Sequence, residues 1–172
     1  MTRRIPPSSI STPSGPGSGI SQTRVLALDL WSRRISVAVS DPLGLTAQGL
    51  ETLVRKGKRA DTLAIVALAR DFHVARIVVG WPLTLDGEEG MAARAAARFV
   101  RQLQRTVGRP VELWDERLTT AQVERVLLEA GSRRRQRRET RDRLAAVVLL
   151  QSWLDARTGG HTNLSGVLRE EP

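Results

Sequence analysis

Three acidic residues, Asp29, Glu116 and Asp142, occupy positions where a carboxylate could do chemistry. Asp29 interrupts the apolar run Arg24–Leu30, which is typical of a strand covered on both faces. A carboxylate is rarely buried in such a strand unless it is paired or bound to a metal ion. Glu116 directly follows the apolar segment Val111–Trp114, at a strand end where open α/β sheets place ligands. Asp142 falls in the first turn of a predicted last helix.

Each acid also has a simpler interpretation. Asp29 could form a salt bridge with an arginine, Glu116 could be a solvated loop residue, and Asp142 could interact with the dipole of its helix. Together, however, the acids form an all-oxygen set in a chain that has no cysteine and two histidines, which favours Mg²⁺ or Mn²⁺ over zinc. Two such ions, roughly 4 Å apart, can activate a water and stabilise the leaving oxygen of a phosphodiester.

The acids can cooperate only if the fold brings them together. If the Arg24–Leu30 strand lies beside the Val111–Trp114 strand, Asp29 and Glu116 come close to one another. If the last helix packs over them, Asp142 reaches the same rim of the sheet. We therefore predict that the three acids converge at one end of the sheet as metal ligands and catalytic residues.

The charge of the chain favours a polyanionic partner. It has 27 Lys+Arg against 18 Asp+Glu, a formal net charge of +9, and most of the cations are arginine. Arginine pairs its planar guanidinium group with phosphate, so we expect nucleic acid as the partner. A compositional habit of the source genome is the alternative explanation.

Two groups of arginines are candidates for contacts with nucleic acid. Arg117, beside Glu116, could clamp a phosphate or hold a neighbouring acid. The basic segment at residues 133–138 could be a substrate clamp, which we favour because five of its six residues are cationic, or a solvated loop. Its arginines are Arg133, Arg134, Arg135, Arg137 and Arg138.

The elements that must position these residues alternate along the chain. We predict a disordered tail at residues 1–22, one α/β domain at residues 23–157 and a shorter C-terminal tail at residues 158–172. The predicted strands are Arg24–Leu30, Ile35–Ser40, Ala47–Leu53, Arg76–Gly80 and Val111–Trp114, the first two forming a hairpin. The predicted helices are Asp61–Phe72, Glu88–Thr106, one beginning at Thr119 and a last one beginning near Thr140. This order predicts a mixed five-stranded sheet flanked by helices.

No apolar run approaches the roughly 18 residues of a membrane span, so we expect a cytoplasmic protein without membrane association.

Four stretches of the chain resemble the YqgF-type family, a group described as Holliday-junction resolvases or pre-16S ribosomal RNA nucleases. They occur in the family's order and span about residues 24–155. They are Leu28-Asp29 with Val37–Asp41, then Ile77–Leu83 with Asp86-Gly87, then Asp115–Thr120, and last Asp142–Ala146.

The resemblance implies an RNase H-like three-layer fold and a divalent-metal-dependent nuclease. The acids that match Asp29, Glu116 and Asp142 are the family's presumed metal-binding catalytic residues. The family is associated with maturing the 5′ end of small-subunit ribosomal RNA in the cytoplasm. We therefore expect a ribosomal RNA precursor as the substrate and a monomer or weak dimer.

The first hairpin departs from the family pattern. Trp31 and Ser36 stand where the family usually has glycine, which permits positive φ and close approach to a ligand. These two changes keep open a non-catalytic nucleic-acid-binding protein as an alternative. A Holliday junction resolvase acting on branched DNA, which should be a stable dimer, is a second alternative because its chemistry would be identical. An actin-like phosphotransferase needs two such domains, and the chain is too short for them.

Overall fold

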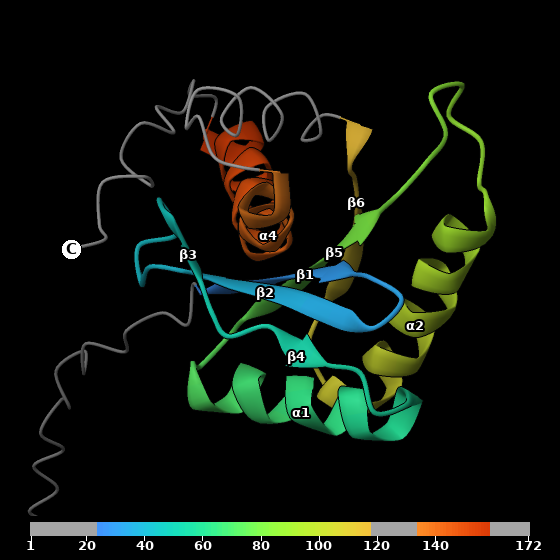
Figure 1. Ribbon diagram of the computed structural model, residues 1–172. Helices are drawn as coiled ribbons and strands as arrows, with labels where there is room; N and C mark the ends of the chain where they lie inside the picture. The colour runs from blue at the N-terminus through green and yellow to red at the C-terminus, as the bar shows by residue number, and fades with distance from the viewer. Residues whose placement is uncertain (1–23, 118–133, 159–172) are drawn as a thin grey trace, which may run out of the picture.

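The computed structural model describes residues 24–117 and 134–158 (Figure 1). The predicted tail at 1–22, the helix predicted from Thr119, and Arg133 lie outside the described residues, as does the second tail beyond its first residue. Side chains are described from Leu144 onward in the last helix, up to Arg157. No helix in the described ranges is long and apolar enough to cross a membrane.

The described strands form one mixed sheet in the order β3-β2-β1-β5-β6, with β4 also paired to β2. The strands are β1 (Val25–Leu30), β2 (Arg34–Ser40), β3 (Ala47–Gly49), β4 (Leu53–Val54), β5 (Arg76–Trp81) and β6 (Val111–Asp115). The predicted hairpin is confirmed, because β1 and β2 pair antiparallel. β1 pairs parallel with β5, and β5 pairs parallel with β6. The apolar runs of β1 and β5 are therefore buried inner strands of the sheet.

The sheet has six described strands where the sequence predicts five, because the predicted strand Ala47–Leu53 is divided into β3 and β4. Both pieces pair antiparallel with β2, but their registers differ. Ala38 lies opposite Gly49, whereas Ile35 lies opposite Leu53. From the first of these pairs to the second, the β3–β4 segment advances four residues while β2 advances three. The β3–β4 segment therefore has one extra residue, as in a β-bulge, and this residue interrupts the pairing.

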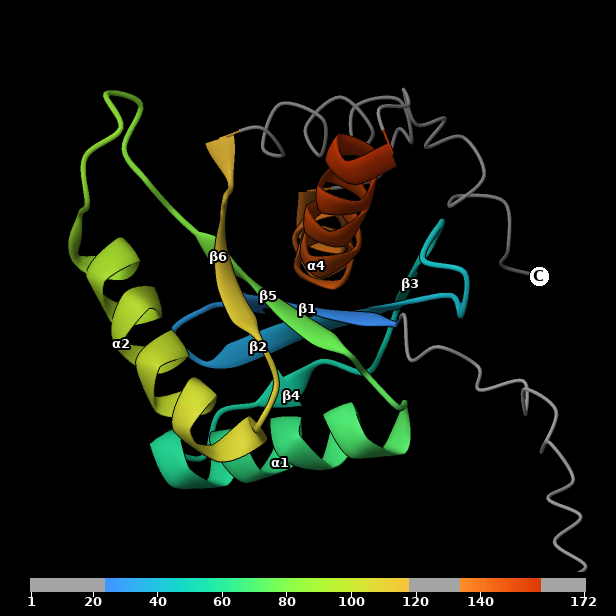
Figure 2. The ribbon, with the colours of Figure 1, turned by 180° about the vertical axis from the view of Figure 1, so that it is seen from behind.

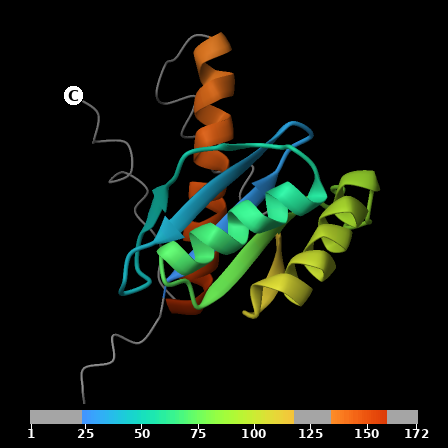
Figure 3. The ribbon, with the colours of Figure 1, turned by 90° about the horizontal axis from the view of Figure 1, so that it is seen from below.

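Three described helices cover the two faces of this sheet. They are α1 (Lys58–Asp71), α2 (Met91–Val107) and α4 (Arg134–Thr158). Helices α1 and α2 lie on one face and α4 lies on the other (Figures 2 and 3). Leu26 and Leu28 of β1 join the core under α1 and α2, and Val25 and Ala27 join the core under α4. Side chains that alternate along each strand therefore divide the core into two layers.

The last helix begins at Arg134, so the prediction of a start near Thr140 is wrong. No glycine or proline follows Gly131 before Thr158, and arginine is a good helix former, so the basic segment continues the helix. The interpretation of residues 134–138 as a loop is corrected to the first turns of α4. Asp142 lies eight residues beyond Arg134, in the third turn, so the prediction of a first-turn position is also wrong.

Candidate active site

The face of the sheet under α4 carries Asp29 and Glu116 at the same end. Asp29 follows Ala27 by two residues, and Ala27 packs in the core under α4. Glu116 follows Trp114 by two residues, and Trp114 packs against the same core. Since side chains two residues apart share a face, both carboxylates are directed to the α4 side. Asp29 is 9% exposed, at the end of a strand whose preceding residues are buried.

The strands of the two acids are not neighbours, contrary to the arrangement that the sequence suggested. β5 lies between β1 and β6, so two inter-strand steps, roughly 10 Å, separate the backbones. The register places Leu28 beside Val79, and Gly80 beside Trp114. Gly80 therefore stands between Asp29 and the end of β6, on the same face as both acids.

Gly80 lets the two carboxylates meet across the intervening strand. A Cβ atom at this position would overlap Oε1 of Glu116 and lie 3.0 Å from its Cδ. The Glu116 side chain thus passes directly over the backbone of Gly80 and reaches Asp29, with which it shares a side-chain hydrogen bond. The backbone N–H of Glu116 donates to the carbonyl of Trp81 at 3.3 Å, which holds the residue at the end of β5.

Electrostatics at the pair favour a proton or a cation. Burial, the negative charge of Asp29 and the hydrogen bond between them raise the pKa of Glu116 to about 8, with a further contribution from Asp115. Without a cation, Glu116 therefore holds a proton at neutral pH and donates it to Asp29. Two carboxylates that cannot both ionise alone can do so around a divalent cation, and their oxygen atoms are the donors that Mg²⁺ and Mn²⁺ prefer. The residues present fit such an ion.

Of the three acids that we predicted to converge, the structure brings Asp29 and Glu116 together. Asp142 lies on α4, the helix that covers the same face of the sheet, but its side chain lies outside the described part. Among the side chains that are described, no group of three or more acids and histidines is placed to hold a metal ion. The role of Asp142 as a third ligand stays a prediction.

Arg117 holds the neighbouring acid Asp115. Its Nε lies 3.0 Å from Oδ1 and 2.9 Å from Oδ2 of Asp115, and its backbone N–H donates to Oδ1 at 3.0 Å. These hydrogen bonds lower the pKa of the Asp115 carboxyl. The guanidinium group also lies against Gly87, where a Cβ would be 3.1 Å from Nη1. Arg117 therefore fixes the geometry beside Glu116, and its binding to nucleic acid stays a prediction.

The two departures from the family pattern both border Asp29. Ser36 is paired with Asp29 in the β1–β2 register, on the same face, and it is fully buried. Trp31 stands in the turn after β1 and is 40% exposed.

Sequence reasoning missed Gly80 as a determinant of the site. A glycine inside an otherwise apolar strand marks a close approach of another group, and Ile77-Val78-Val79-Gly80 carries that signal. The partner that approaches comes from β6, a strand that the local pattern does not connect to β5.

The mixed sheet with helices on both of its faces is the architecture of the RNase H-like fold, and the acid pair lies at one end of this sheet. Among solved structures, T. thermophilus RuvC in complex with a Holliday junction substrate matches with a TM-score of 0.52 at 15% identity, covering 81% of this chain and 98% of that chain. At this identity the likeness concerns the fold, and the predicted RNase H-like fold is confirmed.

The sequence profile of the RuvX family, described as Holliday junction resolvase, matches residues 23–156. The chain belongs to this family. It is 49% identical over 133 residues to a protein of Syntrophus aciditrophicus, covering 77% of this chain and 89% of the relative. A protein of Myxococcus xanthus is 48% identical over 133 residues, with 77% and 88% covered. Both relatives are provisionally named pre-16S rRNA nucleases.

Proposed function

We propose that this protein is a divalent-metal-dependent endonuclease that processes the 5′ end of precursor 16S ribosomal RNA in the cytoplasm. The observation that carries the proposal is the contact of Asp29 and Glu116 over Gly80 at the end of three strands. Relatives provisionally named pre-16S rRNA nucleases, at 48–49% identity, support the choice of substrate.

Asp29 and Glu116 would hold the metal, Mg²⁺ or Mn²⁺, with Asp142 as a third ligand. When bound, the metal supplies activation of a water and stabilisation of the oxygen that leaves the phosphodiester. Asp29 is rigid because it belongs to an inner strand, whereas Glu116 reaches the site through a flexible side chain. As a ligand of this metal, Glu116 would be deprotonated and would give up the proton that it holds in the metal-free protein.

Nucleic acid would be held by positive charge around this site. The chain has a formal net charge of +9. The proposed contacts are Arg117 beside Glu116 and the five arginines of residues 133–138. Contacts of this kind bind the phosphate backbone independently of sequence. Other contacts of the protein therefore have to distinguish one substrate from another.

Branched DNA is the second candidate substrate. It is favoured by the description of the family whose profile matches, Holliday junction resolvase. The chemistry at the acid pair would be the same for RNA and for a four-way DNA junction, so the acids alone do not choose between them. A resolvase would in addition need two active sites, and thus a stable dimer.

The decisive experiment is a cleavage assay on a precursor ribosomal RNA fragment and on a four-way DNA junction, each with Mg²⁺, Mn²⁺ or EDTA. We expect the wild type to cut the RNA near the 5′ end of the mature sequence in Mg²⁺ or Mn²⁺ and not in EDTA. If the protein cut only the junction, the proposed RNA substrate would be wrong and branched DNA would be the substrate.

The Asp29→Asn variant tests the enzyme itself. It keeps the size of the side chain and removes charge from the metal site, so cleavage should fall by several orders of magnitude while the fold is retained. Asp71→Asn is the matched control, because Asp71 is exposed and pairs with Arg70 at the end of α1. Equal activity of wild type and Asp29→Asn would identify the activity as a contaminant and refute the nuclease.

A further inference from the structure

Trp31 is the exposed tryptophan of this chain. All four tryptophans lie in the described ranges, and Trp153 is buried while Trp81 and Trp114 are half-buried. The indoles of Trp153 and Trp114 donate to Glu112 and Ser152. Trp31 is 40% exposed in the turn that joins β1 to β2. A large aromatic surface thus faces solvent two residues after Asp29.

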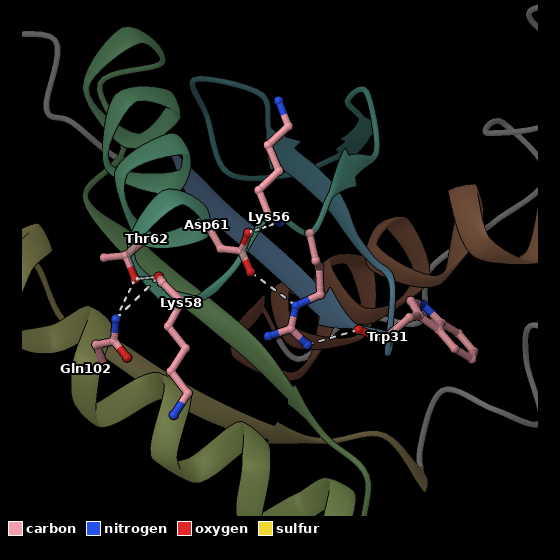
Figure 4. Close-up of polar contacts among 7 residues, drawn as sticks. Trp31, Lys56, Lys58, Asp61, Thr62 and Gln102 are labelled. Carbon is pink, nitrogen blue, oxygen red and sulfur yellow. Dashed lines mark hydrogen bonds and ion pairs between the residues drawn. The ribbon is translucent and has the colours of Figure 1, made fainter.

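The backbone of Trp31 is held on both sides. Its N–H donates to the carbonyl of Arg34 at 2.9 Å, and its carbonyl accepts from Nη1 of Arg55 at 3.1 Å. Arg55 in turn donates through Nε to Oδ2 of Asp61 at 3.2 Å, and Asp61 is 4% exposed. The indole points away from these contacts (Figure 4). Trp31 is therefore an exposed ring on a fixed support.

Four exposed cations continue from this turn along the start of α1. Arg33 lies in the same turn, and its carbonyl accepts the N–H of Arg55 at 3.0 Å. Lys56, Lys58 and Arg59 line a shallow hollow at the beginning of the helix. Neither Arg33 nor any of these three forms an ion pair with a side chain in the described ranges.

The segment that carries the lysines is itself anchored. The backbone N–H of Lys56 donates to Oδ1 of Asp61 at 2.8 Å, and the carbonyl of Lys58 accepts from Thr62 Oγ1 at 2.7 Å and from Gln102 at 3.3 Å. Figure 4 shows both lysine side chains extending away from these contacts. Their charges are free to meet a polyanion.

Proteins that bind single-stranded nucleic acid combine a cationic track for the phosphates with an aromatic face on which a base stacks. Trp31 and Asp29 are two residues apart, so their Cα atoms are at most roughly 7 Å apart. A base next to a phosphate held at Asp29 would therefore lie within reach of the indole. A duplex offers no free base face to the ring, because its bases are stacked and paired.

We propose that Trp31 is a stacking platform for an unpaired base of the substrate beside the cleavage site, and that Arg33, Lys56, Lys58 and Arg59 hold the phosphates of the same strand. This proposal rests on the proposed nuclease function. It implies that the substrate of the nuclease is single-stranded where it contacts Trp31. The platform belongs to this chain in particular, since Trp31 stands where the resemblance places glycine.

The test measures binding in EDTA, where no cleavage occurs. A fluorescein-labelled single-stranded 12-nucleotide RNA and an RNA duplex of the same sequence are titrated with wild type, Trp31→Ala and Trp31→Phe. We expect Trp31→Ala to lose about tenfold in affinity for the single strand and nothing for the duplex. Trp31→Phe should retain most of the affinity. The exposed Leu45→Ala serves as the control and should bind like wild type.

Tryptophan fluorescence gives a second readout. The single strand should quench part of the emission of the wild type, and that part should vanish in Trp31→Phe although binding persists. Equal single-strand affinity of wild type and Trp31→Ala would overturn the platform, as would an equal loss for single strand and duplex. Melting temperatures within about 2 °C of wild type establish that the variants are folded.

The cations are tested through salt. Replacing Lys56, Lys58 and Arg59 by glutamine should reduce the slope of log affinity against log salt by about 0.7 for each phosphate that the protein no longer neutralises. Trp31→Ala should leave this slope unchanged, because stacking releases no counterions. An unchanged slope in the triple variant would overturn the phosphate track. Absence of metal-dependent cleavage together with intact quenching by the single strand would refute the nuclease and leave the platform standing.

Discussion

Gly80 lies beneath the side chain of Glu116, so that a Cβ atom on Gly80 would overlap Oε1 and lie 3.0 Å from Cδ of that carboxylate. Gly80 belongs to β5, which separates the strand of Asp29 from the strand that leads to Glu116. The acid pair therefore depends on a side chain that is missing from the strand between its members. A substitution at Gly80 can therefore test the acid pair without changing either acid.

Gly80→Ala should abolish the pair and leave the fold intact. The methyl group would displace the Glu116 carboxylate from Asp29, and metal-dependent cleavage should fall at least tenfold. The backbone of Gly80 has no positive φ and the displaced atoms end a flexible side chain, so the melting temperature should change little. Calorimetric titration with Mn²⁺ should show weaker binding.

Gly90→Ala is the matched control for this variant. Nothing lies within 4 Å of the added methyl group, and φ at Gly90 is −73°, which alanine adopts readily. It should cleave and bind Mn²⁺ like wild type. If Gly80→Ala retained full activity, the contact of Asp29 with Glu116 would not be needed for catalysis.

The raised pKa of Glu116 predicts how the stability of the metal-free protein depends on pH. Its ordinary value is 4.5 and its value in the fold is about 8, so between these values the folded state binds a proton that the unfolded state has lost. The contribution of Glu116 to the free energy of unfolding is therefore largest below about pH 4.5. It declines as the pH rises to 8, by at most about 1.4 kcal/mol per pH unit.

Urea unfolding in EDTA from pH 5 to 8.5 measures this decline. Glu116→Gln cannot titrate, so its free energy of unfolding should fall less than that of the wild type across the window. Parallel curves for the two proteins would show that the carboxyl has no raised pKa. Adding Mn²⁺ should stabilise the wild type more at pH 8 than at pH 6, because the ion displaces the proton.

The arginines of residues 133–138 should contribute electrostatic affinity for nucleic acid. Replacing all five by glutamine should weaken binding to many sequences alike and lower the slope of log affinity against log salt by about 0.7–0.9 for each phosphate that is no longer bound. Fluorescence anisotropy at several salt concentrations measures the slope. The exposed Arg70→Gln, whose arginine pairs with Asp71, is the control. A slope equal to that of wild type would make the segment a solvated helix start.

Asp61 should matter far more to stability than its neighbour Asp71 on the same helix. Asp61 is buried and accepts from Nε of Arg55 at 3.2 Å and from the N–H of Lys56 at 2.8 Å. Asp61→Ala leaves these donors without their acceptor and should cost about 2–3 kcal/mol of unfolding free energy. Asp71→Ala removes an exposed pair and should cost less than about 1 kcal/mol. Similar losses in the two variants would contradict the role assigned to Asp61.

Periodicity and composition determined the parts of the molecule that depend on local sequence. The short gap between the apolar run at residues 24–30 and the alternating run at residues 35–40 predicted the hairpin of β1 and β2, and an acid in an apolar strand marked Asp29 as unusual. The same pattern located β5, β6 and the helices α1 and α2 to within about three residues. These features are local because strand and helix periods show directly which residues face a core. Gly131 gave too weak a boundary to mark where α4 begins, since arginine is equally compatible with a helix and with a solvated segment.

The order of the strands was decided only by the tertiary structure. Nothing in the local pattern says that β5 separates β1 from β6, because the pairing partner of a strand depends on which apolar faces fit together over long sequence distances. The same holds for the meeting of Asp29 and Glu116, which required Gly80 from a third segment, and for the bulge that divides β3 from β4. Sequence alone could name the two acids, but their contact exists because three strands distant in sequence end side by side and the middle one has no side chain there.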